Sequence, residues 1–292
     1  MEALSSEAGE VAVRAWFDAL EARHLANLRQ VEVTRALRAL SSAYVERRDR
    51  LSHGAALDGA GKRAAFALFY GPLHFLLARE IVRAVEPAAP DIRGRGGVSP
   101  EGENPPRPQV GELADLLVDL GCGTGVAGAA WALHCGPAAR LLGIERHPWA
   151  ADEARWTCRT LGVAADIKCT DAARVRLPSR ASGIVAAFTV NELPAETREG
   201  LLRELLAAHN RGARVLVIEP IAKSLAPWWP SWADAFRTAG GREDIWRFPA
   251  DLPDITRRLD RAAGLDHREL TGRSLYLPGS RPKTAAPEEA SS

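Results

Sequence analysis

The sequence predicts an α/β fold in which a mostly parallel sheet, covered by helices on both faces, follows an N-terminal helical region. Short apolar runs that suit buried strands alternate with longer helical patterns across residues 110–278. One such run, residues 116–120, enters a glycine-dense turn that opens a small-residue helix. Ahead of the sheet, residues 7–51 and 62–85 carry apolar side chains at helical spacing.

Residues 1–86 are expected to form the N-terminal helical region. An apolar stripe that includes Trp16 and Leu20 recurs among charged residues in the first part. Residues 62–85 are much more apolar, and Gly71 and Pro72 should kink or divide this helix. Its most apolar part, residues 64–78, is short for a membrane span, so a buried helix is predicted. Residues 87–109 are rich in proline and glycine and are expected to be a linker.

The domain that follows is expected to span residues 110–278, with a disordered tail at 279–292. Its parallel strands are predicted at 116–120, 140–144, 165–169, 183–190 and 214–218, and its helices at 126–133, 150–161, 195–209 and 255–263. A C-terminal hairpin is predicted from residues 266–270 and 274–277, turning at Thr271 and Gly272.

Composition narrows the compartment and the partners. The chain has 292 residues, 46% of them hydrophobic, and a formal charge of +1, which gives no sign of a surface dedicated to nucleic acid or membrane. Its four cysteines form no C-x-x-C pair, so we expect a reducing cytoplasm and no metal site. The first residues lack the pattern of a signal peptide. The oligomeric state is not predicted.

The glycine turn indicates a nucleotide-type cofactor, and two readings of it compete. The run from Gly123 to Gly128 fits the dinucleotide spacing G-x-G-x-x-G, with Glu145 near the expected ribose position, which favours an NAD-type oxidoreductase. Against this, Asp119 lies directly before the turn. A carboxylate at the mouth of the turn would repel a pyrophosphate and attract a sulfonium and an ammonium group.

The frame Asp-Leu-Gly-Cys-Gly-Thr-Gly at residues 119–125 resembles the first motif of the class I S-adenosylmethionine-dependent methyltransferases. This resemblance implies a Rossmann-like sheet ending in an antiparallel hairpin, and S-adenosylmethionine as cofactor. It also implies a role for each matching residue. Gly121, Gly123 and Gly125 would shape the turn against the methionine part, Asp119 would orient its amino end, Glu145 would accept hydrogen bonds from the ribose hydroxyls, and Asp171 would receive the adenine amino group.

The family places residues that face the reactive methyl at the end of the fourth strand, where this chain has Asn191 and Glu192. Asn191 is expected to position an acceptor, and Glu192 to act as a base if burial raises its pKa. The alternative is that Asn191 and Pro194 only cap the next helix. Relatives that methylate exocyclic nitrogens carry two prolines and an aromatic residue here, and this chain does not.

The acceptor pocket is expected between the indole-rich segments 228–232 and 244–248, which could equally be ordinary packing. The kink at residues 70–74 could cover the site, with His74 either in the core or at the site. We therefore expect a methyltransferase that acts on a small or medium-sized acceptor. A more distant resemblance to methyltransferase-like proteins of mitochondrial small-ribosomal-subunit assembly leaves a role on ribosomal RNA as the alternative.

Overall fold

The computed structural model describes residues 2–46, 57–86, 115–172, 175–222 and 226–279. The N-terminal region is helical, as predicted. It consists of α1 (Glu2–Leu25), α2 (Gln30–Glu46), α3 (Ala60–Ala65), the π-helical turn η3 (Phe66–Tyr70) and α4 (Gly71–Val85). The predicted linker at 87–109 and all but the first residue of the predicted tail at 279–292 lie outside the described residues.

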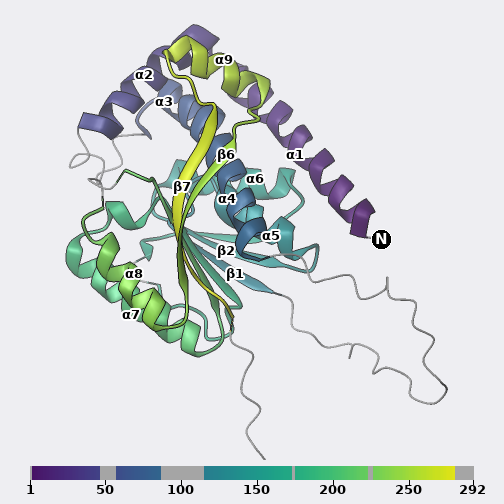
Figure 1. Ribbon diagram of the computed structural model, residues 1–292. Helices are drawn as coiled ribbons and strands as arrows, with labels where there is room; N and C mark the ends of the chain where they lie inside the picture. The colour runs from purple at the N-terminus through teal and green to yellow at the C-terminus, as the bar shows by residue number, and fades with distance from the viewer. Residues whose placement is uncertain (1, 47–56, 87–114, 173–174, 223–225, 280–292) are drawn as a thin grey trace, which may run out of the picture.

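A single seven-stranded sheet forms the centre of the molecule, with the order β3-β2-β1-β4-β5-β7-β6 (Figure 1). The other strands all run in one direction and β7 runs opposite to them, so the mostly parallel sheet is confirmed. The strands are β1 (Leu116–Leu120), β2 (Arg140–Glu145), β3 (Ala164–Cys169), β4 (Gly183–Ala187), β5 (Arg214–Glu219), β6 (Arg242–Pro249) and β7 (Glu269–Leu277).

Helices cover both faces of the sheet because the central strands are apolar on both sides. In β1, Leu117 belongs to one hydrophobic cluster and Val118 to the other. The first face packs against α4 and two helices that follow β1 and β2, and the second face packs against two later helices (Figure 1). These helices are α5 (Val126–Cys135), α6 (Pro148–Thr160), α7 (Ala195–Asn210) and α8 (Trp229–Thr238).

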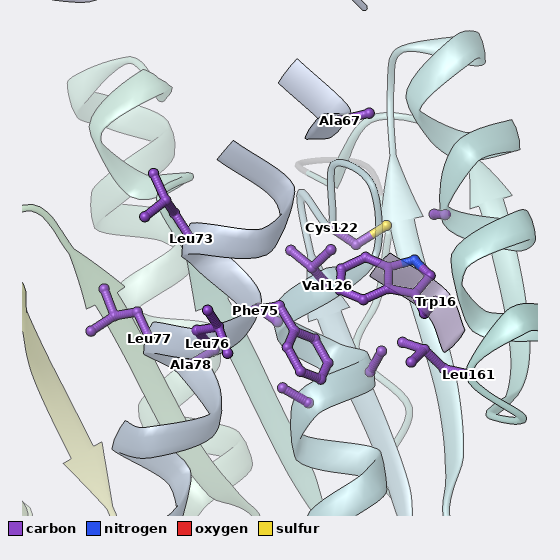
Figure 2. Close-up of a cluster of buried hydrophobic side chains, with 14 of the residues drawn as sticks. Trp16, Ala67, Leu73, Phe75, Leu76, Leu77, Ala78, Cys122, Val126 and Leu161 are labelled. Atoms are coloured by element: carbon purple, nitrogen blue, oxygen red, sulfur yellow. The ribbon is translucent and has the colours of Figure 1, made fainter. Parts of the chain in front are cut away.

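The N-terminal helices share one core with the sheet. Trp16 from α1 and Phe75 from α4 lie 5.1 Å apart between ring centroids, and both are buried. Figure 2 shows these rings beside Val126 of α5 and Leu161, which follows α6. The helical region is therefore built into the first face of the sheet.

The C-terminal strands are antiparallel, as expected, but the predicted hairpin is wrong: residues 269–270 and 274–277 belong to one strand, β7, and α9 (Asp254–Ala263) separates β7 from β6 in the chain. Thr271 and Gly272 do not form a turn: they lie inside β7, opposite Arg247 and Trp246 of β6. Gly272 is needed for packing, because a Cβ there would lie 2.9 Å from a methyl carbon of Leu77 in α4. Segment 244–248, expected to wall the acceptor pocket, is instead part of the edge strand β6.

The apolar helix at 60–85 continues through Pro72 rather than dividing there. Pro72 has no N–H for the carbonyl of Leu68, one α-helical turn earlier, and the backbone widens into η3 just before it. The buried hydroxyl of Thr256 donates to the Leu68 carbonyl oxygen at 2.8 Å. By length and composition alone residues 60–85 could cross a membrane, but 72% of their most apolar window is buried inside the protein, as expected for a core helix.

A helical cap lies over the carboxyl ends of the parallel strands. Helix α9 (Asp254–Ala263) connects the carboxyl end of β6 to the start of β7, which places it at this edge. Thr256 attaches α9 to η3, and the Arg38 guanidinium of α2 donates to the Ala262 carbonyl at 2.5 Å. Figure 1 shows α2, α3 and α9 together at this end of the sheet.

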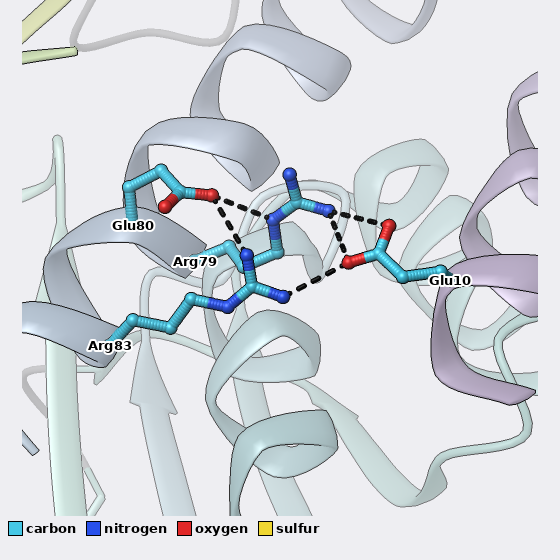
Figure 3. A network of polar contacts seen from close by, with 4 residues as sticks. All are labelled: Glu10, Arg79, Glu80 and Arg83. Atoms are coloured by element: carbon cyan, nitrogen blue, oxygen red, sulfur yellow. Dashed lines mark hydrogen bonds and ion pairs between the residues drawn. The ribbon is translucent and has the colours of Figure 1, made fainter. Parts of the chain in front are cut away.

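Two sets of ion pairs fasten α1. The buried carboxylate of Glu153 in α6 accepts from Arg23 at 3.1 Å and contacts the His24 ring nitrogen at 2.7 Å. In the first half of α1, Glu10 joins a more exposed network of Arg79, Glu80 and Arg83 (Figure 3). Exposed pairs contribute little, so the Glu153 contacts are the stronger attachment.

Candidate cofactor and reaction site

The glycine turn after β1 opens toward a ligand at one position. Gly121, Gly123 and Gly125 all have left-handed backbones, with φ of 66°, 53° and 79°. A Cβ on Gly121 would lie 2.4 Å from Thr189, and one on Gly125 would lie 3.0 Å from Ala154. A Cβ on Gly123 would meet nothing within 4 Å. Gly121 and Gly125 therefore serve close packing, and Gly123 is where the backbone is accessible to a cofactor.

The carboxylate of Glu145 borders this opening. One oxygen accepts from the Gly123 N–H at 2.9 Å and the other from the His147 N–H at 2.7 Å. The side chain thus connects the end of β2 to the glycine turn and to the start of α6. Each carboxylate oxygen keeps a further lone pair, so the group fits the two hydroxyls of a ribose without losing its backbone contacts.

The structure corrects the expectation for Asp119. Its side chain is 1% exposed and lies under the first turn of α5, where one oxygen accepts from the Gly128 N–H at 2.8 Å. Burial raises the pKa of this carboxyl group to about 7, although the hydrogen bond acts in the opposite direction. Asp119 therefore does not present a charge at the mouth of the turn. The sequence identified the residue but not the direction of its side chain.

Asp171 follows β3 at the same edge of the sheet. The preceding residue, Thr170, donates its N–H to the Glu145 carbonyl at 2.9 Å, which brings the ends of β2 and β3 together. The Asp171 side chain is exposed. This position is compatible with the adenine role that the family resemblance implies, and that role stays a prediction.

Asn191 lies in the 3₁₀ turn η6 (Val190–Glu192) and is held by two partners. Its amide nitrogen donates to Glu219 at 2.7 Å, and its amide oxygen accepts from the Trp228 indole at 2.8 Å. Glu219, the last residue of β5, is fully buried, and burial raises its pKa to about 8. Pro194, not Asn191, precedes α7 as its N-cap residue, so the capping alternative for Asn191 is wrong.

Glu192 does not meet the condition set for a base. Its side chain is 42% exposed and lies 3.8 Å from the Arg146 guanidinium. The burial that would raise its pKa is therefore missing. The buried carboxyl group beside this loop is that of Glu219, at the end of β5, and its pKa is the one that burial raises.

Helix α4 covers the turn and the loop after β4. A Cβ on Gly71 would lie 3.9 Å from the Thr124 hydroxyl oxygen, and one turn later the His74 ring stacks on Phe188 with centroids 3.9 Å apart. Phe188 is the only residue other than glycine with positive φ in the described part of the chain, at 57°. Residues 70–74 thus lie beside the glycine turn and the loop after β4, where a segment that covers the site was expected. Glu219 was expected at this edge of the sheet because it directly follows a predicted strand, whereas nothing in the sequence marked Phe188 or Thr189.

Most of the indoles serve packing. Trp229 and Trp232 are buried against the second face of the sheet, and the Trp246 indole donates to the Ser274 hydroxyl. We call residues 188–194, between β4 and α7, the reaction loop. Among the indoles of the described residues, Trp228 alone donates a hydrogen bond to this loop, at Asn191. Among the residues that the structure describes, no three His, Cys, Asp or Glu side chains are grouped to hold a metal ion.

Comparison with known proteins agrees with this geometry. Residues 117–212 match a family model described as a methyltransferase domain. Comparison with curated protein sequences gives no significant match.

Several solved structures are similar over most of the chain. They include the mitomycin 7-O-methyltransferase MmcR, with 19% identity over 91% of this chain and 73% of that one, at a TM-score of 0.45. The plantazolicin methyltransferase BpumL has 12% identity over 86% and 98%, at 0.47. A putative O-methyltransferase from Nostoc punctiforme has 16% identity over 84% and 69%, also at 0.47.

The matched segment begins in β1 and runs through the glycine turn, Glu145 and the reaction loop to the start of β5. Beyond it, β7 lies between β5 and β6 and is antiparallel to both. The resemblance to class I methyltransferases implied the antiparallel ending of the sheet but not this strand order. The cofactor of such a domain is S-adenosylmethionine, and the open Gly123 beside Glu145 fits it. Residues 117–212 therefore form a methyltransferase domain, and the sheet that contains them has the Rossmann-like fold of the class I S-adenosylmethionine-dependent methyltransferases.

Proposed function

We propose that this methyltransferase transfers the methyl group of S-adenosylmethionine to a small or medium-sized acceptor. The observation that carries the proposal is the open backbone of Gly123 beside the Glu145 carboxylate, at the carboxyl edge of a parallel sheet. When bound, the cofactor supplies a methyl carbon that a positively charged sulfur has already activated. The protein then has to hold the acceptor near that carbon and exclude water.

The helices that cover the candidate site favour an acceptor of limited size. Helix α4 contacts the glycine turn through Gly71 and the loop after β4 through His74, so the site is covered by the protein's own N-terminal region. The near-neutral charge of the chain, +1, gives no electrostatic support for a ribosomal RNA substrate. No comparison supports that alternative either.

The reaction loop contributes by being fixed. Glu219 and Trp228 occupy both ends of the Asn191 amide, and Thr189 donates to the Gly121 carbonyl at 3.1 Å. The loop is therefore tied to β5, α8 and the glycine turn at once. We assign Asn191 a positioning role: by fixing the reaction loop relative to the glycine turn, it would hold the acceptor at a constant distance from the cofactor.

Calorimetric titration of the full chain with S-adenosylhomocysteine, S-adenosylmethionine and NAD tests the proposal. We expect dissociation constants of about micromolar for the first two, which is common for cofactors, and no binding of NAD. Glu145→Ala removes an acceptor of at least two charge-assisted hydrogen bonds and should weaken binding about ten- to a hundredfold.

Asp152→Ala is the matched control for this titration. Asp152 lies in the same helix-start region, but its side chain is 74% exposed and forms an ion pair with Arg155 on the surface. Its affinity for both ligands should equal that of the wild type. Binding of NAD without binding of the sulfur ligands would show that the proposed function is incorrect.

A further inference from the structure

His74 is a polar side chain at the site with no assigned partner. It is partly exposed within a run of α4 in which residues 71–73 and 75–78 are buried. Neither ring nitrogen has a hydrogen bond within the described part of the chain, whereas His24, His147 and His267 each have one. Because the ring is partly exposed and neither nitrogen is bonded to a described residue, both nitrogens are available to a bound molecule.

The residue under the imidazole ring is conformationally strained. Phe188 follows β4 and adopts a φ of 57°, a value that aromatic residues rarely take, while its N–H donates to the Ile218 carbonyl at 2.8 Å. This backbone turns the Phe188 ring toward α4, where the His74 ring lies almost parallel to it at an interplanar angle of 16°. The stack fixes the plane of the imidazole, and both nitrogens lie on the edge of the ring rather than on its stacked face.

The ring is neutral at physiological pH. Burial lowers the pKa of His74 to about 4, and no charged group contributes to this shift. A neutral imidazole has one nitrogen that donates and one that accepts. Its surroundings are aromatic, with Tyr70 at 5.9 Å on the same helix. Such a site suits an uncharged, flat molecule better than an ion.

We propose that His74 binds the acceptor by accepting a hydrogen bond from its hydroxyl group, so that the methyl acceptor is a flat, uncharged hydroxyl compound. This inference depends on the proposed function and specifies its substrate class. In the transfer, the acceptor oxygen bonds to the methyl carbon while the carbon–sulfur bond breaks, and sulfur keeps the electron pair. The hydroxyl proton passes to the free ring nitrogen of His74 and then to water.

A weakly basic imidazole is sufficient for this step. The hydroxyl proton becomes strongly acidic only as the oxygen gains its bond to carbon, so the proton can leave late in the reaction. Before that point, His74 orients a lone pair of the acceptor oxygen by holding its hydrogen. The ring lies on α4, stacked on the residue that follows β4, and one helical turn after Gly71, which faces Thr124 of the glycine turn.

Nuclear magnetic resonance of the histidine ring nitrogens, with the full chain saturated with S-adenosylhomocysteine, tests the proposal. The probes are 1-naphthol and 1-methoxynaphthalene, which differ only in the hydroxyl hydrogen that His74 would accept. We expect 1-naphthol to shift the His74 ring-nitrogen resonances saturably and to bind about tenfold more tightly than its methyl ether, as the loss of one hydrogen bond implies.

His74→Phe keeps a ring that can stack on Phe188 but removes both nitrogens. This variant should bind both probes with the weaker affinity, while its affinity for S-adenosylhomocysteine stays unchanged. His134→Phe, at the far end of α5, is the control and should keep the preference for 1-naphthol. If the wild type binds S-adenosylhomocysteine but does not prefer 1-naphthol, or if His74→Phe keeps the preference, the role of His74 is wrong. Failure of the wild type to bind S-adenosylhomocysteine would instead contradict the proposed function.

Discussion

We expect the Thr256 hydroxyl to contribute measurably to the free energy of unfolding. It connects α9 to η3 at the carbonyl oxygen of Leu68, one helical turn before Pro72. Pro72 leaves the Leu68 carbonyl without its α-helical N–H, and the Thr256 hydroxyl donates to that oxygen at 2.8 Å from a fully buried position. Thr256→Val keeps the shape of the side chain and removes the donor. Leaving a buried carbonyl without this partner costs about 1–3 kcal/mol, partly offset by the added methyl group.

We therefore expect Thr256→Val to lower the free energy of unfolding by about 1–2 kcal/mol, or the melting temperature by about 2–8 °C. Urea denaturation followed by fluorescence measures this as a lower midpoint at constant slope. Thr34→Val is the control, because the buried Thr34 hydroxyl donates at 3.0 Å to Gln30, whose carbonyl also lies within reach of the helix's own N–H. Equal effects of the two substitutions would refute the reasoning about Pro72.

Three further outcomes follow from the geometry. The pKa of Asp119 is raised to about 7 in the folded protein, so the free energy of unfolding should fall as pH rises from about 4 to 7. Denaturation at several pH values should show Asp119→Asn becoming more stable relative to the wild type over that range. Gly123→Ala should weaken the binding of S-adenosylhomocysteine and lower the free energy of unfolding by only about 1–2 kcal/mol, the cost of its positive φ. Gly121→Ala places a Cβ 2.4 Å from Thr189, so this variant should unfold at a clearly lower temperature than Gly123→Ala. His24→Ala should cost about 1–3 kcal/mol because it removes a partner of a buried carboxylate, and Glu10→Gln, in the exposed network, less than about 1 kcal/mol.

Local patterns predicted the central strands well. Predicted residues 116–120 are β1, and predicted residues 140–144 are β2 without its last residue. These strands are buried on both faces, so they appear in the sequence as continuous apolar runs between turn residues.

The edge of the sheet was harder to predict. β6 begins with Arg242, Glu243 and Asp244 and exposes every second residue, so it carries no apolar run. Gly272 looked like a turn residue because no local signal distinguishes a glycine needed for a turn from one needed for close packing with Leu77.

The prediction of the site was limited because local sequence does not show where a side chain points or what it contacts. The sequence located Gly123 and Glu145 because a motif fixes their position in a strand-turn-helix unit. It could not show that Asn191 is held by Glu219 and Trp228, since those partners are 28 and 37 residues away along the chain. The positive φ of Phe188 is imposed by tertiary contacts and has no signature in an aromatic residue.

The burial of Asp119 changes the physical reason why this turn favours one cofactor over another. A pyrophosphate bound in the dinucleotide manner needs free N–H groups in the first turn of the helix after β1. In this protein the N–H of Gly128, the third residue of α5, is already bonded to Asp119, and Gly125 is packed against Ala154. Asp119 therefore disfavours a phosphate by occupying one of the donors that the phosphate would use, and a carboxyl group does this whether or not it is ionised. The remaining accessible backbone, at Gly123, adjoins the Glu145 carboxylate, which suits a ribose and a cationic sulfur compound rather than a second anion.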